Sequence, residues 1–197
     1  MNDPAQDEQD RQDMARLAGG HDDALNSLMD RHGQRLFHYL LRQSSNPADA
    51  EDCAQEAFAR VYLHRAKFRA GAKFTTWLYA IATNLAHDCH HRRARHPEVA
   101  LPAAESGRGG LETMPDPSPL PGEQMQACER AAQVRAAVEA LPEELRVPLV
   151  LFEYENLAQT EIGQILRCSP KAVELRIYRA RKLLRKLLAG LSLRAVI

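Results

Sequence analysis

The stretch "EIGQILRCSPKAVELRIYRARKLLRKLL", residues 161–188, carries the pattern that indicates how the C-terminal part of this chain folds. Three apolar residues, Ile162, Ile165 and Leu166, recur at the spacing of one helical face. A brief turn at residues 167–168 follows, and a second, longer stretch of helical spacing then begins. The pattern predicts two helices separated by a tight turn.

The second helix has a strong start signal in Ser169 and Pro170. The serine hydroxyl can cap the helix, and proline at the first helical position forfeits no needed hydrogen bond. A tight turn of this kind often uses a glycine with positive φ, whereas this chain offers Arg167 or Cys168. We therefore expect a turn that is slightly strained or differently built.

The second helix has one apolar and one basic side. At about 100° per residue, the apolar side collects Val173, Ile177, Ala180, Leu184 and Leu187. The opposite side collects Lys171, Arg179, Lys182, Arg185 and Lys186. Such a helix suits a reader of the DNA major groove, because its apolar side holds it on the domain while the other side faces DNA. An ordinary amphipathic surface helix and a basic membrane-surface helix are the alternatives.

Composition predicts a soluble, mainly helical protein. The 197 residues carry zero net charge and are 45% hydrophobic but only 6% aromatic, with frequent Ala, Leu and Arg, which favours helix over sheet. The cysteines form no C-x-x-C pair, so a zinc ribbon or disulfide framework is not indicated and a reducing cytoplasm fits best. The polar, acidic start and the lack of a long apolar run predict neither a signal peptide nor membrane insertion.

The charge is unevenly spread along the chain. Residues 1–30 hold eight acids against two arginines, whereas residues 165–190 hold eight bases against one glutamate. Residues 60–95 form a second basic stretch with Asp88 as its one acid. Each basic stretch is a candidate phosphate-binding surface.

Six prolines and four glycines lie between His96 and Cys128, a composition typical of a linker. A long loop inside one domain is the alternative. We predict an all-α protein in which two small helical domains are joined by a flexible Pro/Gly-rich linker. The predicted parts are an acidic N-terminal tail at 1–11, a domain at 12–95, the linker at 96–128, a second domain at 129–190 and a C-terminal tail at 191–197.

The segment "NPADAEDCAQEAFARVYLHRAKF", residues 46–68, predicts another helix that Pro47 starts. One face of it collects Ala50, Cys53, Ala54, Ala57 and Val61. Asp49, Asp52 and Glu56 line up on another face. This acidic stripe is either a solvated helix face or a docking surface for a basic partner.

The segment "KFTTWLYAIATNLAHDCHHRRAR", residues 73–95, begins as an apolar helix and ends in polar and basic residues. Candidate metal ligands are His87, Cys89, His90, His91 and His96. His87, His90 and His91 share a helical face. However, the positive charges of Arg92 and Arg93 oppose cation binding, and only Asp88 offers a carboxylate that could hydrogen-bond to a liganding histidine. We predict no metal and no cofactor, with a metal sensor or metalloenzyme as an alternative.

Taken together, these segments resemble the extracytoplasmic-function (ECF) sigma factors of bacterial RNA polymerase, in the sigma-70 family. "DAEDCAQEAF" (residues 49–58) looks like region 2.2, and "FTTWLYAIATNLAHDCHHRRAR" looks like regions 2.3 and 2.4. "LPEELRVPLVL", together with the opening stretch, looks like region 4. Their order, with a Pro-rich linker between them, makes the resemblance specific.

The resemblance implies a non-catalytic subunit that selects promoters, and the chain shows no enzyme motif. The implied partners are core RNA polymerase, through its β′ clamp coiled coil and β subunit, promoter DNA and an anti-sigma factor. A stand-alone DNA-binding regulator is the alternative, and it would bind promoter DNA tightly without polymerase.

The resemblance also implies residue roles. The polymerase-binding set is Asp49, Asp52, Gln55 and Glu56. The set for melting and holding minus-10 DNA is Lys73, Asn84, Asp88, Arg92 and Arg93. The set for the minus-35 duplex is Lys171, Glu174, Leu175, Arg176, Arg179 and Lys182. Trp77 matches a family tryptophan, for which we favour core packing over base stacking. Glu174 stands where relatives often carry lysine and could accept a hydrogen bond from a cytosine amine, so promoter preference cannot be copied from a relative.

Overall fold

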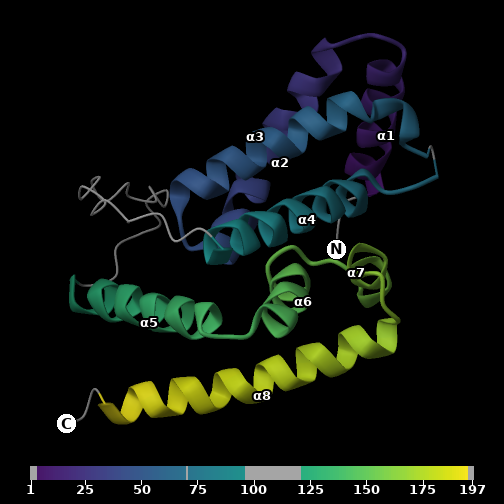
Figure 1. The fold of residues 1–197 in the computed structure, drawn as a ribbon. Helices are drawn as coiled ribbons and strands as arrows, with labels where there is room; N and C mark the ends of the chain where they lie inside the picture. The colour runs from purple at the N-terminus through teal and green to yellow at the C-terminus, as the bar shows by residue number, and fades with distance from the viewer. Residues whose placement is uncertain (1–3, 70, 96–120, 195–197) are drawn as a thin grey trace.

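A computed structural model describes residues 4–69, 71–95 and 121–194 of the chain (Figure 1). These residues form eight α-helices and one 3-10 helix and contain no strand, which confirms the all-α prediction. The elements are α1 (Pro4–Ala18), α2 (Asp23–Ser44), α3 (Pro47–Leu63), the 3-10 helix η1 (Arg65–Lys67), α4 (Phe74–Arg95), α5 (Pro121–Glu139), α6 (Glu143–Glu153), α7 (Gln159–Leu166) and α8 (Pro170–Arg194). None of these helices is both long and apolar enough to cross a membrane.

Helices α1 to α4 form the N-terminal domain, in which α2 packs against each of the other three. The predicted apolar face of α3 is confirmed, since Ala50, Cys53, Ala57 and Val61 are buried. Asn46 caps α3, because its side-chain oxygen accepts a hydrogen bond of 2.9 Å from the backbone N–H of Ala48.

Helix α4 buries one side in the same core, through Phe74, Leu78, Tyr79, Ala82 and Leu85. Trp77 is half-buried on this helix, and its ring lies 5.3 Å from that of Phe68 and 6.5 Å from that of Phe74. These ring contacts support the packing interpretation of Trp77.

Helices α5 to α8 form the C-terminal domain, in which α5, α6 and α7 all pack on the long α8 (Figure 1). The predicted apolar faces are confirmed. Val173, Ile177 and Ala180 of α8 are buried, and so are Ile162 and Ile165 of α7. Helices α7 and α8 therefore form the predicted pair.

The predicted turn between α7 and α8 adopts its positive φ at Arg167, with φ 52° and ψ 44°. A non-glycine residue in this conformation costs roughly 1–2 kcal/mol, so the expectation of a strained turn holds. Gly163 makes the turn possible, since a Cβ at this position would lie 2.7 Å from the backbone oxygen of Cys168. The sequence interpretation missed this requirement.

The predicted acidic tail at residues 1–11 is wrong from Pro4 onward, where α1 begins. Proline suits the first helical turn, and α1 buries Met14 and Leu17. The acid Asp10 is also buried. It forms an ion pair with Arg31 and lies 2.9 Å from Nε2 of His32, both on α2. The cluster of acids that suggested a tail is therefore in part a structural ion-pair network.

Two further boundaries differ from the prediction. Residues 121–128, which were assigned to the linker, belong to α5, because Pro121 starts this helix rather than preventing it. Residues 191–194, assigned to a C-terminal tail, continue α8 past Gly190, since one glycine costs a helix only about 1 kcal/mol. Linker residues 96–120 lie outside the described part of the chain.

The two domains pack against each other. Helix α4 lies against α7 (Figure 1), as the contacts between their residues also show. Helix α2 contacts both α5 and α6. The sequence does not predict this arrangement.

Candidate functional site

The acidic stripe lies on α3. Asp52, Gln55 and Glu56 are exposed, and Asp49 is half-buried near the start of the helix. Glu56 pairs with Arg60 one turn later, with 2.9 Å between Oε1 and Nε. Its i, i+4 geometry makes this a weak surface pair that a partner could replace. All four predicted polymerase-binding residues therefore lie together on one helix.

The predicted minus-10 residues lie along α4 and just before it. Asn84 and Asp88 are exposed, and Lys73 directly precedes the helix. At 3.6 residues per turn, Lys73, Asn84 and Asp88 fall within about 60° of one another. The backbone of α4 also includes Arg92 and Arg93, whose side chains lie outside the described part of the structure.

The ammonium group of Lys73 forms ion pairs with two carboxylates. Its Nζ lies 2.9 Å from Oε1 of Glu161 on α7 and 3.4 Å from Oδ2 of Asp7 on α1. The hydrogen bond to Glu161 raises the pKa of Lys73 most, and the charges of both acids raise it further. Lys73 is thus held in its charged form by acids from two other helices.

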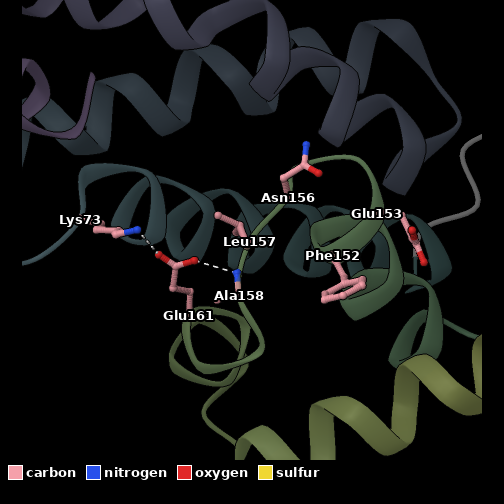
Figure 2. A pocket seen from close by; sticks show the side chains of 7 residues that line it. All are labelled: Lys73, Phe152, Glu153, Asn156, Leu157, Ala158 and Glu161. Carbon is pink, nitrogen blue, oxygen red and sulfur yellow. Dashed lines mark hydrogen bonds and ion pairs between the residues drawn. The ribbon is translucent and has the colours of Figure 1, made fainter. Parts of the chain in front are cut away.

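The acid Glu161 has a second role, which Figure 2 shows. Its Oε2 accepts a hydrogen bond of 2.7 Å from the backbone N–H of Ala158 at the start of α7. Ala158 has no side-chain acceptor, so this is one half of a capping box. The two residues line an open cavity of about 390 Å³ between the domains, together with Lys73, Phe152, Glu153, Asn156 and Leu157.

The predicted minus-35 residues gather on the outer side of α8. Ser169 caps this helix as predicted, with 3.2 Å between its hydroxyl and the N–H of Ala172. The exposed members of the set are Lys171, Glu174, Leu175, Arg179 and Lys182. Lys171 and Glu174 form an ion pair of 2.9 Å. This pair must separate if Glu174 is to accept a hydrogen bond from a base.

The remaining member of the set, Arg176, is half-buried, and its guanidinium lies 3.8 Å from the Cys168 sulfur. Arg176 therefore also contacts the turn between α7 and α8. Tyr178, which the sequence interpretation missed, is 60% exposed on the same side of α8 as Lys171 and Lys182. The i, i+7 spacing of Lys171 and Tyr178 could have identified it, but the side opposite the apolar face was defined by its lysines and arginines alone.

The candidate metal ligands lie only in part among the residues that the structure describes. No group of three His, Cys, Asp or Glu residues that could hold a metal occurs among the residues that the structure describes. The side chains of His90 and His91, and all of His96, lie outside those residues.

Two parts of the chain match known families. Residues 28–96 match Sigma-70 region 2, and residues 131–184 match Sigma-70, region 4. Together they cover α3, α4, α7 and most of α8, the helices that carry the predicted site residues.

Relatives match over most of the chain. The ECF RNA polymerase sigma factor SigW of Bacillus subtilis is 35% identical over 87% of this chain and 92% of its own length. The RNA polymerase sigma-H factor of Pseudomonas aeruginosa is 33% identical over 93% of this chain and 96% of its own length. The ECF RNA polymerase sigma-E factor of Escherichia coli is 32% identical over 85% of this chain and 87% of its own length.

Solved structures agree with the fold. The structure of CnrH in complex with the cytosolic domain of CnrY is 25% identical, with a TM-score of 0.69, and covers 92% of this chain and 98% of its own. The sigma factor RpoE of Bartonella quintana, in complex with the anti-sigma factor NepR, is 19% identical with a TM-score of 0.62, over 83% of this chain and 96% of its own. The second likeness concerns the fold alone. Sequence identity above 30% along nearly the whole chain, together with both matched regions, places this protein in the ECF sigma factors of the sigma-70 family.

Proposed function

We propose that this chain binds core RNA polymerase through α3, opens and holds minus-10 DNA along α4, and reads the minus-35 duplex with α8. The observation that carries the proposal is the α8 face, where predicted DNA-binding residues are exposed on a capped helix that α7 holds in place. The proposal gives catalysis to the polymerase and promoter choice to this chain.

The α3 stripe supports a basic partner. Asp52 and Glu56 are exposed side by side at i, i+4, where like charges destabilise a helix slightly. A basic partner could replace the weak surface pair of Glu56 with Arg60 and add charge-assisted hydrogen bonds to both acids. The clamp coiled coil of the β′ subunit is the partner that the family suggests.

The two DNA-binding surfaces use different chemistry. The α4 set combines an amide, a carboxylate and a lysine, which suits the polar edges and phosphates of an opened strand. The α8 set is mainly basic and lies on a helix that a major groove can admit. Exposed Tyr178 on α8 would add contact area beside the bases.

The related complexes support control by an anti-sigma factor. CnrH is bound there by the cytosolic domain of CnrY, and RpoE by the anti-sigma factor NepR. We propose the same class of partner for this chain, which would then act in the cytoplasm beside the polymerase.

A run-off transcription assay with purified core RNA polymerase tests the proposal. The assay would use a library of promoter fragments, with core enzyme alone as the control. Promoter-specific transcripts that require both core enzyme and this chain are expected. Tight, specific binding of promoter DNA by the chain alone, with no transcript from any fragment, would instead favour the stand-alone regulator.

A further inference from the structure

Two cysteines of the N-terminal domain contact each other. Cys53 lies on α3 and Cys89 on α4, and both are free thiols. Cys53 is only 8% exposed and belongs to the core, whereas Cys89 is half-buried and packs against that core. A hydrogen bond joins their two side chains. Thiols that lie about 35 residues apart in the sequence are therefore neighbours in the fold.

The packing of α3 on α4 sets this contact. Cys53 lies one helical turn before Ala57 and two turns before Val61, and all three are buried on one face of α3. Cys89 lies one turn after Leu85, which is buried on the inner side of α4. The two helices pack against each other along these faces. The same packing that forms the core therefore holds the two thiols together.

The dithiol lies directly beneath two of the proposed binding surfaces. On α3, Cys53 follows Asp52 and precedes Glu56 by three residues, and both acids are exposed members of the proposed polymerase-binding set. On α4, Cys89 follows Asp88, an exposed member of the proposed minus-10 set. The pair thus connects the helix proposed to bind polymerase with the helix proposed to hold opened DNA.

The two thiols have different surroundings. Burial, the adjacent Cys89 and the acids Asp49 and Asp52 raise the pKa of Cys53 to about 11, with burial as the largest cause. Cys53 therefore stays protonated near neutral pH and is not the thiol that an oxidant attacks first. Cys89 is the more exposed of the two and is the one that an oxidant from solution can reach.

We propose that Cys53 and Cys89 form a reversible disulfide that weakens assembly with core polymerase under oxidising conditions. The effect on assembly rests on the function proposed above for α3, whereas the formation of the disulfide does not. The oxidant is a hydroperoxide, for which hydrogen peroxide is the probe.

The reaction has two steps. The Cys89 thiolate attacks one peroxide oxygen, the O–O bond breaks, and the products are a sulfenic acid on Cys89 and hydroxide, which takes up the proton that Cys89 released. The Cys53 sulfur then attacks the Cys89 sulfur, the S–O bond breaks, and the departing oxygen leaves as water with the proton of Cys53. Two thiols are oxidised and one peroxide is reduced to two waters.

The disulfide should act on the α3 surface through the core. A covalent bond holds two sulfur atoms closer together than a hydrogen bond does, so α3 is drawn toward α4 at Cys53. Protein cores are close-packed and transmit such displacements, so Asp52 and Glu56 move with their helix. Cellular thiols reduce an accessible disulfide, which returns the surface to its reduced form.

Peroxide treatment of the free chain tests the disulfide. The variant C128S/C168S keeps only the proposed pair, because Cys128 and Cys168 are the other two cysteines. Mass spectrometry should show a loss of about 2 Da after peroxide, with both thiols blocked to maleimide until dithiothreitol is added. Adding C53A to this background removes the second thiol, so the sulfenic acid on Cys89 should persist and react with dimedone. Adding C89A should abolish the reaction at the same peroxide concentration.

Fluorescence titration with core polymerase tests the effect on assembly. The oxidised C128S/C168S chain, labelled at its N-terminus and freed of peroxide, should bind core enzyme about fivefold more weakly than the reduced chain, which is about 1 kcal/mol. Dithiothreitol should restore the affinity. The matched control C53A/C128S/C168S cannot form the disulfide, so peroxide should leave its affinity unchanged.

Two results would overturn the proposal: a C128S/C168S chain that forms no disulfide under conditions that oxidise Cys89 in the C53A control, and a disulfide that leaves the affinity for core enzyme unchanged. Circular dichroism verifies that each variant is folded. A reduced wild-type chain that neither binds core enzyme nor supports run-off transcription would instead refute the proposed function. A reduced chain that does both, with an affinity that peroxide does not change, refutes only the switch.

Discussion

The hydroxyl of Tyr79 donates a hydrogen bond of 2.5 Å to the buried carboxylate of Glu155, and this bond joins the two domains. Burial raises the pKa of Tyr79 above its usual 10.0, and the negative charge of Glu155 raises it further. Because only the neutral phenol can donate this hydrogen bond, the junction requires a protonated Tyr79.

The raised pKa of Tyr79 predicts a loss of stability in alkali. A raised folded-state pKa stabilises the protein fully below the unfolded-state value of 10.0, and the stabilisation decreases as pH rises above it. Each such group contributes a slope of about 1.4 kcal/mol per pH unit. We expect Y79F to reduce the alkaline slope by about this amount, measured by urea unfolding at pH 9 to 11. The matched control is Y178F, at an exposed tyrosine, and an equal reduction there would contradict the assignment.

Replacing Gly163 with alanine and replacing Gly33 with alanine should change the free energy of unfolding in opposite directions. At Gly163 a Cβ would lie 2.7 Å from the Cys168 oxygen, whereas nothing lies within 4 Å of a Cβ at Gly33 in α2. We expect G163A to lower the free energy of unfolding by about 1–3 kcal/mol through overpacking. G33A should raise it by up to about 1 kcal/mol through helix propensity. Thermal unfolding of both variants checks the prediction, and a stable G163A would show that the turn can move aside.

Asp10 should be needed for the docking of α1. It is fully buried and pairs with Arg31 and His32 of α2. D10N leaves Arg31 with only Asp13, which lies 2.7 Å away, so we expect a loss of about 3 kcal/mol in urea unfolding. E8Q, which breaks the exposed pair with Arg11, should leave stability unchanged. Equal effects of the two variants would count against a structural role for Asp10.

Charge reversal on α3 should weaken assembly with core polymerase. D52K adds a positive charge to the proposed contact with a basic partner, so its affinity for core enzyme should fall at least tenfold, which is about 1.4 kcal/mol. Fluorescence titration of labelled chain with core enzyme measures this affinity. D30K makes the same charge change at an exposed acid of α2 and should bind like the wild type. Unchanged binding by D52K would remove α3 from the proposed interface.

Lys182 should contact DNA phosphate, whereas its neighbour Arg181 should not. Lys182 is exposed, and Arg181 is paired with Glu153 at 2.6 Å. In holoenzyme bound to promoter DNA, K182A should reduce the slope of log affinity against log salt concentration by about 1. R181A should leave that slope unchanged. The reverse outcome would place a different side of α8 against the duplex.

The helices of the C-terminal domain could be predicted because their signals are local. Ser169 and Pro170 mark the start of α8, and the spacing of Val173, Ile177 and Ala180 marks its buried face. Helical periodicity and capping depend on neighbours within a few residues. The same holds for the acidic stripe on α3, whose members one helix brings together.

Local composition gave wrong boundaries where long-range contacts decide the outcome. The acids of residues 1–11 suggested a tail, but Asp10 pairs with Arg31 and His32 on a different helix. The prolines suggested a linker as far as residue 128, although Pro121 starts α5. The presence of charged residues or prolines in a segment does not specify which distant residues that segment contacts after folding.

The sequence alone was enough to predict helices α3, α4, α7 and α8, the order of the two matched regions and the sides of α3, α4 and α8 that carry the proposed sites. The burial of Glu155 between Tyr79 and Arg35, and the ion pair of Glu161 with Lys73, became visible only in the folded chain. Helix faces follow from a period of 3.6 residues, which is present in any short window of sequence. A buried carboxylate is stable only beside its partners, and these partners come from distant parts of the chain that folding brings together.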